Sequence, residues 1–342
     1  MSGDGREGRA RIATVLGVSV AVGALLVLAM LPAATSAVRL VRPAVLAAAD
    51  PTCFTGDTPR DPGYDPVTHE MYVPNEGYPG EPNGAPNISV FSGTCHLVGT
   101  ISLSTGAVPI QAAFDPMNND MYVTDAGLNQ VYVISGTKIL DTITGFDEPM
   151  GITFDEYQPG MVVVNSGADL VDLVVGTAYT PLFFTGSDPY EILFDPSCVC
   201  DLVTNTGSDN VTIYREYVPV FTDSEPVGKS PRGIAYDPLT GFEYVANSGS
   251  NNISILDAGT LQPFIISGLD GPYGVAWDQS TLTIWVTNDG NGKVFEIGGS
   301  GGVSIVKKLS TASGSHALGL AYDEFNDDMY VTGFDTNVVY VL

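Results

Sequence analysis

One pattern of apolar and polar positions returns seven times along the chain. In each copy an apolar run ends in an aromatic residue followed by Asp, and a short polar turn leads to a second β-rich run and an Asn/Gly-rich turn. The aromatic–Asp pairs are Tyr64-Asp65, Phe114-Asp115, Phe154-Asp155, Phe194-Asp195, Tyr236-Asp237, Trp277-Asp278 and Tyr322-Asp323. They are spaced by 40 to 50 residues. A period near 40 built from strands is typical of a β-propeller.

Residues 230–268 show why each copy is a four-stranded unit. Pro238 presets φ and Gly241 accepts a positive φ, so the residues between them form a tight turn. The strands expected in this copy cover residues 230–237, 242–246, 252–257 and 262–267. The third of these alternates polar and apolar residues, which buries one face. The sequence therefore predicts an all-β fold: a seven-bladed β-propeller of four-stranded antiparallel blades.

The seventh copy stops after its third strand, at Leu342. Residues 51–55 lie ahead of Asp65 at the distance where a fourth strand precedes the other repeated Asp residues. We therefore expect this segment to complete blade 7 and close the ring, which leaves few strand edges exposed.

The second strand of each copy carries its own motif. It is recognisable in Met71-Tyr72-Val73, Met121-Tyr122-Val123-Thr124-Asp125, Leu202-Val203-Thr204-Asn205, Ile284-Trp285-Val286-Thr287-Asn288 and Met329-Tyr330-Val331-Thr332. With this motif, residues 51–342 resemble the YVTN family of propeller repeats, of the archaeal surface-layer and bacterial secreted type. Blade 3 departs most, since residues 162–165 have lost the Tyr and the Thr. The resemblance implies a fold and a cell-surface or secreted location; it implies no activity, because propellers host many functions.

Residues 12–31 form an uncharged apolar stretch preceded by three arginines. We expect one N-terminal hydrophobic helix here, as a signal peptide or as a membrane anchor. Small-residue cleavage sites follow at residues 35–37 and 47–49. The expected segments are a signal peptide or membrane anchor over residues 1–37, a linker over 38–50 and the propeller over 51–342. Either alternative exports the propeller to an extracellular or cell-surface location.

The charge narrows the possible partners. The chain has a formal net charge of −26 at pH 7, with 39 Asp and Glu against 13 Lys and Arg. Such a field repels nucleic acid and anionic lipid surfaces. It suits cations, cationic partners, or solubility alone.

Four cysteines in an exported chain predict disulfides. Cys53 and Cys95 are expected near outer strands of adjacent blades 7 and 1, where a bond between them would hold the ring closed. Cys198 and Cys200 lie in the first turn of blade 4. A strained disulfide or a metal site could join this second pair, and the sequence shows no further Cys pair or neighbouring His in favour of a metal.

Three Asn-x-Ser/Thr sequons start the third strand of their blades, at Asn87, Asn210 and Asn252. They are candidate N-glycosylation sites. The alternative is that the repeat itself favours this spacing, because a turn Asn leads into an alternating strand.

A binding site is expected at the mouth of the central channel. There the loops leading into the first strands meet the turns between second and third strands. Glu148, Asp188 and Glu191 come from adjacent blades 3 and 4, and three carboxylates held together bind Ca²⁺ or Mg²⁺. His316 of blade 7 is a candidate general base.

Further candidates at the mouth bind ligands rather than metal. Tyr190, Arg232 and Tyr273 are suited to an anionic or ring-bearing ligand. Tyr78 lies in an unusually long Pro/Gly-rich loop of blade 1, residues 75–86. The constellation resembles, by type of position and not by motif, virginiamycin B lyase-like and gluconolactonase-like propellers, which pair channel-mouth acids and a metal with catalytic residues. This resemblance assigns no role to any residue of this chain.

The seven repeated Asp residues are interpreted as structural, since an Asp at a strand end accepts N–H bonds from the following turn. The sequence favours a non-catalytic binding or scaffold module that binds envelope proteins or glycans. The alternative is a divalent-cation-dependent lyase or hydrolase working at the channel mouth.

Overall fold

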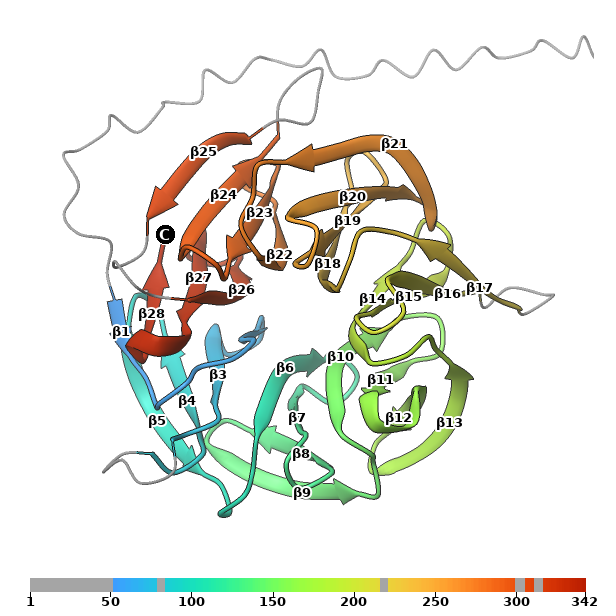
Figure 1. Cartoon of the computed structure of the whole chain (residues 1–342). Coiled ribbons are helices and arrows are strands. Elements are labelled where there is room, and N and C mark those ends of the chain that lie inside the picture. The colour runs from blue at the N-terminus through green and yellow to red at the C-terminus, as the bar shows by residue number, and fades with distance from the viewer. Residues whose placement is uncertain (1–51, 79–83, 216–220, 299–304, 311–315) are drawn as a thin grey trace, which may run out of the picture. The chain divides into compact units, whose positions relative to one another are not determined.

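A computed structural model describes residues 52–78, 84–215, 221–298, 305–310 and 316–342. Its strands form seven four-stranded antiparallel sheets, which surround a central axis (Figure 1). The predicted seven-bladed propeller is confirmed. The expected N-terminal helix and linker lie outside the described residues. No helix within the described ranges is long and apolar enough to span a bilayer.

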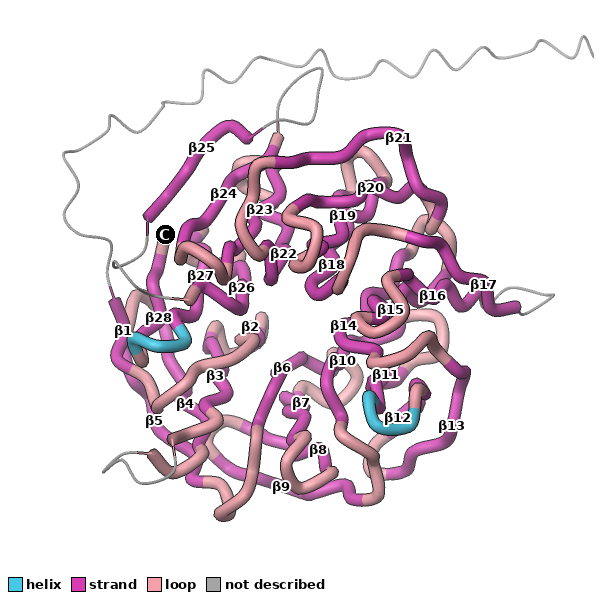
Figure 2. The backbone as a smooth tube through the Cα atoms, in the orientation of Figure 1, coloured by secondary structure: helices cyan, strands magenta, loops and turns pink. Residues whose placement is uncertain are grey.

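In blades 1 to 6 the strands follow the chain outward from the axis (Figure 2). Blade 1 contains β2 (Gly63–Asp65), β3 (Glu70–Asn75), β4 (Asn87–Ser92) and β5 (His96–Ser102). Blade 2 contains β6 (Pro109–Asp115), β7 (Asp120–Asp125), β8 (Gln130–Ser135) and β9 (Lys138–Thr144). Blade 3 contains β10 (Pro149–Asp155), β11 (Gly160–Asn165), β12 (Leu170–Val175) and β13 (Ala178–Phe184). Blade 4 contains β14 (Pro189–Asp195), β15 (Cys200–Asn205), β16 (Asn210–Arg215) and β17 (Phe221–Pro226).

The remaining blades keep the same order. Blade 5 contains β18 (Pro231–Asp237), β19 (Phe242–Asn247), β20 (Asn252–Asp257) and β21 (Thr260–Ser267). Blade 6 contains β22 (Pro272–Asp278), β23 (Thr283–Asn288), β24 (Lys293–Ile297) and β25 (Ile305–Ser310). Blade 7 contains β26 (Ala317–Asp323), β27 (Asp328–Gly333), β28 (Val338–Val341) and, from the start of the chain, β1 (Thr52–Phe54). Two short 3₁₀ turns, η1 (Ser166–Ala168) and η2 (Phe334–Thr336), complete the described elements.

The ring closes as predicted. Strand β1 pairs antiparallel with β28, Cys53 opposite Val339. Cys53 is bonded to Cys95 at the end of the β4–β5 turn in blade 1, with a Cα–Cα distance of 4.9 Å. A covalent bond therefore joins the strand that closes blade 7 to its neighbour.

The second-strand motif links neighbouring blades. Its Tyr donates from the hydroxyl to a carbonyl in the outer turn of the next blade: Tyr72 to Gly136, Tyr122 to Gly176 and Tyr330 to Gly93. Its Thr donates to a carbonyl in the first strand of the next blade: Thr124 to Met150, Thr204 to Arg232 and Thr287 to Leu318. The motif thus repeats because it satisfies buried polar groups between blades.

The repeated Asp has the predicted structural role. In all seven blades it is buried, and its Oδ1 accepts the backbone N–H two residues later at 2.7–3.0 Å. Each Asp therefore fixes the turn between the first two strands, on the side of the ring away from the first-strand loops.

The Asn and the Ser or Thr of each sequon accept hydrogen bonds from an Asn at the end of the second strand of the same blade. Asn75 Nδ2 donates to Asn87 Oδ1 at 3.0 Å and to Ser89 Oγ at 3.1 Å. The same pattern joins Asn205 to Asn210 and Thr212, and Asn247 to Asn252 and Ser254. Turn geometry therefore accounts for the Asn-x-Ser/Thr spacing without a glycan, and glycosylation stays a prediction.

Candidate active site

The loops that lead into the first strands share one face with the turns between second and third strands. In every blade, one residue of the turn between the second and third strands donates its backbone N–H to a carbonyl in the loop that enters the first strand. The accepting residue is the one just before the Pro, or its equivalent, at the entry to that strand. These carbonyls belong to Thr58, Val108, Glu148, Asp188, Ser230, Gly271 and His316. The seven loops therefore form one rim around the channel mouth, as the repeats predicted.

Glu148 and Asp188 occupy an architectural position on this rim. Both are exposed and adopt a positive φ, 53° and 50°. Their N–H groups donate to Asn129 Oδ1 at 2.9 Å and Asp169 Oδ1 at 3.0 Å in the preceding blades. The residues at the same place in blades 1, 5 and 6, which are Thr58, Ser230 and Gly271, share the positive φ and the same type of bond.

Glu191 belongs to a different layer, inside the channel. Four blades have Gly at its position: Gly151, Gly233, Gly274 and Gly319. A Cβ added to Gly233 would lie 2.4 Å from Tyr273 O, so Gly allows neighbouring first strands to approach closely there. The other three blades place Asp61, Gln111 and Glu191 at this position instead. The structure therefore does not bring Glu191 together with Glu148 and Asp188.

The three inner side chains form a polar ring. Asp61 and Gln111 are bridged through their backbones. Gln111 Nε2 donates to Glu191 Oε1 at 2.6 Å, and Gln111 Oε1 accepts the N–H of Ile152 at 2.7 Å. All three line a cavity of about 50 Å³. A cavity of this size holds water or a small chemical group.

The two carboxyls of the ring differ in proton affinity. Burial raises the pKa of Asp61 to about 6, against the lowering effect of the Arg60 and Arg232 charges. Burial, and then the negative charge of Asp61, raises the pKa of Glu191 to about 8. Near neutral pH the site therefore holds one carboxylate and one carboxylic acid, the arrangement that acid–base catalysis needs.

Two tyrosines line the same cavity, and the charges of two arginines reach its Asp61. The Tyr190 and Tyr273 hydroxyls are hydrogen-bonded to each other, and both side chains are buried. The Arg232 guanidinium lies 4.5 Å from the Tyr190 ring centroid and 5.6 Å from that of Tyr273. The predicted ligand-binding trio of Tyr190, Arg232 and Tyr273 is thus brought together.

Arg60, Asp61 and Gln111 complete the site, and the sequence did not single them out. Arg60 pairs with Glu76 at the base of the long blade 1 loop, and its guanidinium lies 5.0 Å from the Phe334 ring centroid. The available signal was the loss of Gly at the inner-ring position. Tyr78, farther along the loop, is 60% exposed; residues 79–83 lie outside the described chain.

His316 lies on the rim between two carboxylates. Its Nδ1 is 2.6 Å from Asp289 Oδ1 and its Nε2 is 3.2 Å from Asp335 Oδ2. The hydrogen bond and charge of Asp289, with the charge of Asp335, raise the pKa of His316 despite partial burial. Both nitrogens are therefore occupied, and His316 joins blades 6 and 7 in the arrangement seen here.

The residues at the mouth do not fit the expected Ca²⁺ or Mg²⁺ site. Among described residues, the one group of three His, Cys, Asp or Glu whose ligand atoms lie within 4.8 Å of one another is Asp195, Cys198 and Cys200, away from the mouth. In the inner ring, the charges of Arg60 and Arg232 act on Asp61. A hard cation prefers several uncompensated oxygens.

No protein-family model matches the chain, and a search of characterised proteins finds no match. Solved structures do match. A streptogramin B lyase is 13% identical, covering 84% of this chain and 93% of that one, with a TM-score of 0.70. A catalytically inactive His-to-Ala virginiamycin B lyase from Staphylococcus aureus, solved with quinupristin, is 14% identical over 86% and 96% of the two chains, with a TM-score of 0.67. Kuenenia stuttgartiensis hydrazine synthase is 15% identical over 88% and 98%, with a TM-score of 0.68.

These likenesses show the propeller fold. They also correct the functional expectation from the sequence. The interpretation as a non-catalytic binding or scaffold module is wrong, because the similar propellers include lyases and favour the enzyme alternative. The sequence misled here because polar loop residues look alike in catalytic and non-catalytic propellers.

Proposed function

We propose that the protein is an acid–base enzyme, a lyase, with its site at the channel mouth. The observation that carries the proposal is the Asp61–Glu191 pair, two carboxyls of different proton affinity that line one cavity, with the charges of two arginines acting on Asp61. The similar lyase propellers support the reaction class.

The inner ring supplies the proton transfers. Asp61, ionised near neutral pH, takes a proton from a carbon next to a carbonyl group of the substrate. The bond from the neighbouring carbon to its leaving oxygen breaks, a carbon–carbon double bond forms, and protonated Glu191 gives its proton to that oxygen. General acid–base catalysis of this kind contributes about 10²–10⁴-fold to a rate.

The arginines bind and stabilise charge. Arg60 and Arg232 are positioned to hold a carboxylate or the developing enolate oxygen, as preorganised cations do. The cavity of about 50 Å³ admits only the reacting group. The body of the substrate therefore lies over the rim, between the blade 1 loop and His316.

His316 is the second candidate for proton transfer. A histidine is replaced in the inactive virginiamycin B lyase, and His316 is the histidine of this chain that lies on the mouth. Because Asp289 and Asp335 occupy both its nitrogens, it takes part only after a substrate displaces one of them.

The test uses quinupristin and a panel of simpler lactones and esters with an acidic C–H next to the carbonyl. Elimination opens a lactone without changing its mass and creates a conjugated chromophore, whereas hydrolysis adds one water. We expect the first result, with loss of turnover in Glu191→Gln and retention in Asp141→Asn, an exposed carboxylate on outer strand β9. Equal turnover in Glu191→Gln and the parent would contradict the proposed site.

We further propose that the propeller belongs with YVTN-type repeats and works outside the cytoplasm, as an extracellular or surface-anchored enzyme. The apolar segment at residues 12–31 and two disulfides support this location. Cell fractionation followed by intact-mass measurement tests it and shows whether the first 37 residues are removed and whether Asn87, Asn210 or Asn252 carries a glycan.

A further inference from the structure

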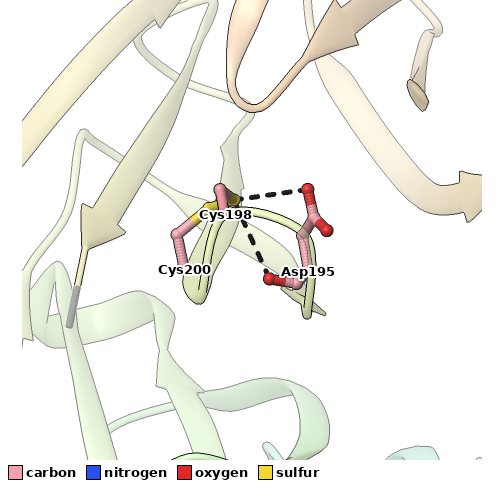
Figure 3. Close-up of side chains that lie close together, drawn as sticks. All are labelled: Asp195, Cys198 and Cys200. Carbon is pink, nitrogen blue, oxygen red and sulfur yellow. Dashed lines mark hydrogen bonds between the residues drawn. A yellow bond between two sulfur atoms is a disulfide. The ribbon is translucent and has the colours of Figure 1, made fainter. Parts of the chain in front are cut away.

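The first turn of blade 4 brings two sulfurs next to a carboxylate (Figure 3). Cys198 and Cys200 are disulfide-bonded. Cys198 Sγ lies 3.2 Å from Asp195 Oδ2, and the ligand atoms of all three residues lie within 4.8 Å of one another. Asp195 and Cys200 are fully buried, and Cys198 is 9% exposed.

A carboxyl from blade 5 lies beside Asp195. Glu243 is fully buried, and its Oε1 accepts the Gly259 N–H at 3.3 Å. Burial, and then the hydrogen bond and charge of Asp195, raise the pKa of Glu243 to about 9. Burying one carboxyl beside another in a core is costly unless something compensates it.

Blades 4 and 5 depart from the repeat at the position of this carboxyl. In each blade the residue paired across strands with the aromatic of the aromatic–Asp pair is buried. Five blades have an apolar residue there: Met71, Met121, Met161, Ile284 and Met329. Blades 4 and 5 have the carboxyls of Asp201 and Glu243 in this place, and Glu243 comes from the blade next to the chain's one Cys-x-Cys turn.

We propose that reduction of the Cys198–Cys200 disulfide creates a site for one thiophilic divalent cation, such as Zn²⁺, held by both sulfurs and Asp195, with Glu243 beside Asp195 positioning its carboxylate. A dithiol reductant supplies two electrons and two protons, so the disulfide becomes two thiols while the reductant is oxidised to its own disulfide. Metal binding then releases the two thiol protons. Two sulfurs and one carboxylate oxygen leave the fourth position of a tetrahedral Zn²⁺ to water.

The surroundings favour thiolate ligands. Arg215 Nη1 lies 3.9 Å from Cys200 Sγ, and its Nη2 donates to Ala258 O at 2.9 Å, which fixes the guanidinium. A cation beside a cysteine stabilises the thiolate. In the oxidised protein the sulfurs are unavailable as thiolates, so the site is controlled by redox state.

The experiment uses the full chain, reduced with a phosphine, desalted without oxygen and titrated with Co²⁺ and then Zn²⁺. We expect one Co²⁺ per chain with a thiolate-to-cobalt charge-transfer band, displaced by Zn²⁺, and no band in the oxidised protein. Glu243→Met, which introduces the residue of most other blades, should weaken binding by more than about tenfold. Asp195→Asn should do the same, while Asp115→Asn, the matched Asp of blade 2, should not.

Cys53→Ser with Cys95→Ser controls for the other disulfide and should keep the band. The proposal is overturned if reduced, folded protein shows no thiolate band, if Glu243→Met binds as tightly as the parent, or if the band depends on Cys53 and Cys95. Loss of the cooperative thermal melt on reduction would also overturn it, because the site requires blades 4 and 5 to be folded.

Discussion

The inner ring of the channel and the interface between blades 4 and 5 each hold two acidic side chains close together. In the channel, Asp61 and Glu191 have nearby arginines and an amide donor. At the interface, Glu243 lies beside Asp195, whose carboxyl is next to the Cys198 sulfur. The neighbouring groups separate the two cases: arginines suit an anionic substrate, whereas carboxyls beside sulfurs suit a cation.

The largest expected effect is the loss of turnover when the acid in the channel is replaced. Glu191→Gln keeps the shape and the contact with Gln111 but cannot donate the same proton. We expect turnover of an active substrate to fall by about 10²–10⁴-fold. The equivalent substitution at the interface, Glu243→Gln, should leave turnover unchanged. Steady-state kinetics of both variants measures the difference. A comparable loss of turnover in both would mean that the substitutions act by destabilising the fold and not by removing a catalytic group.

The pH profile sharpens the acid–base assignment. Activity requires Asp61 ionised, above its pKa of about 6, and Glu191 protonated, below its pKa of about 8. We therefore expect a bell-shaped profile of kcat/KM with its maximum between these values. In Glu191→Gln the fall at alkaline pH should disappear from the residual activity. A profile that rises steadily through pH 8 would contradict Glu191 as the acid.

The free energy of unfolding tests the role of the buried carboxyl between blades 4 and 5. Glu243→Met replaces a buried carboxyl with the side chain used at Met121 and its counterparts. We expect the free energy of unfolding of the oxidised protein to rise by about 1–3 kcal/mol, because burying one carboxyl beside another is costly. The reverse change, Met121→Glu, should lower it. Urea unfolding followed by fluorescence measures both, and a stability loss in Glu243→Met would show that the carboxyl is already well compensated.

The smallest effect concerns the rim. Because Asp289 and Asp335 raise the pKa of His316 in the folded protein, its contribution to stability is present below the unfolded value of about 6.5 and is lost as pH rises through the folded value. Asp289→Asn should lower this pKa more than Asp335→Asn, since the Asp289 hydrogen bond contributes most. NMR titration of the ring protons measures it, and equal values in all three proteins would contradict the ion-pair geometry.

The sequence by itself determined what depends on local pattern. Alternation and turn residues predicted every blade. The repeated Asp fixes the same turn in all seven blades, and the Tyr and Thr of the second strand recur because they bond the next blade wherever the motif is kept. Closure by residues 51–55 and the Cys53–Cys95 bond followed from counting strands. Glycine at the inner-ring position likewise marks a close approach that only a residue without a side chain allows.

Only the tertiary structure decided which side chains meet. Asp188 and Glu191 lie three residues apart in the sequence, yet Asp188 has a positive φ on the rim and Glu191 lines the cavity in the channel. Closeness in the sequence therefore did not show which carboxylates meet. Asp61 and Glu191 lie 130 residues apart in the chain and converge because the ring closes. A repeat fixes each blade's internal geometry; the distance between residues of different blades depends on the ring as a whole, which no single repeat encodes.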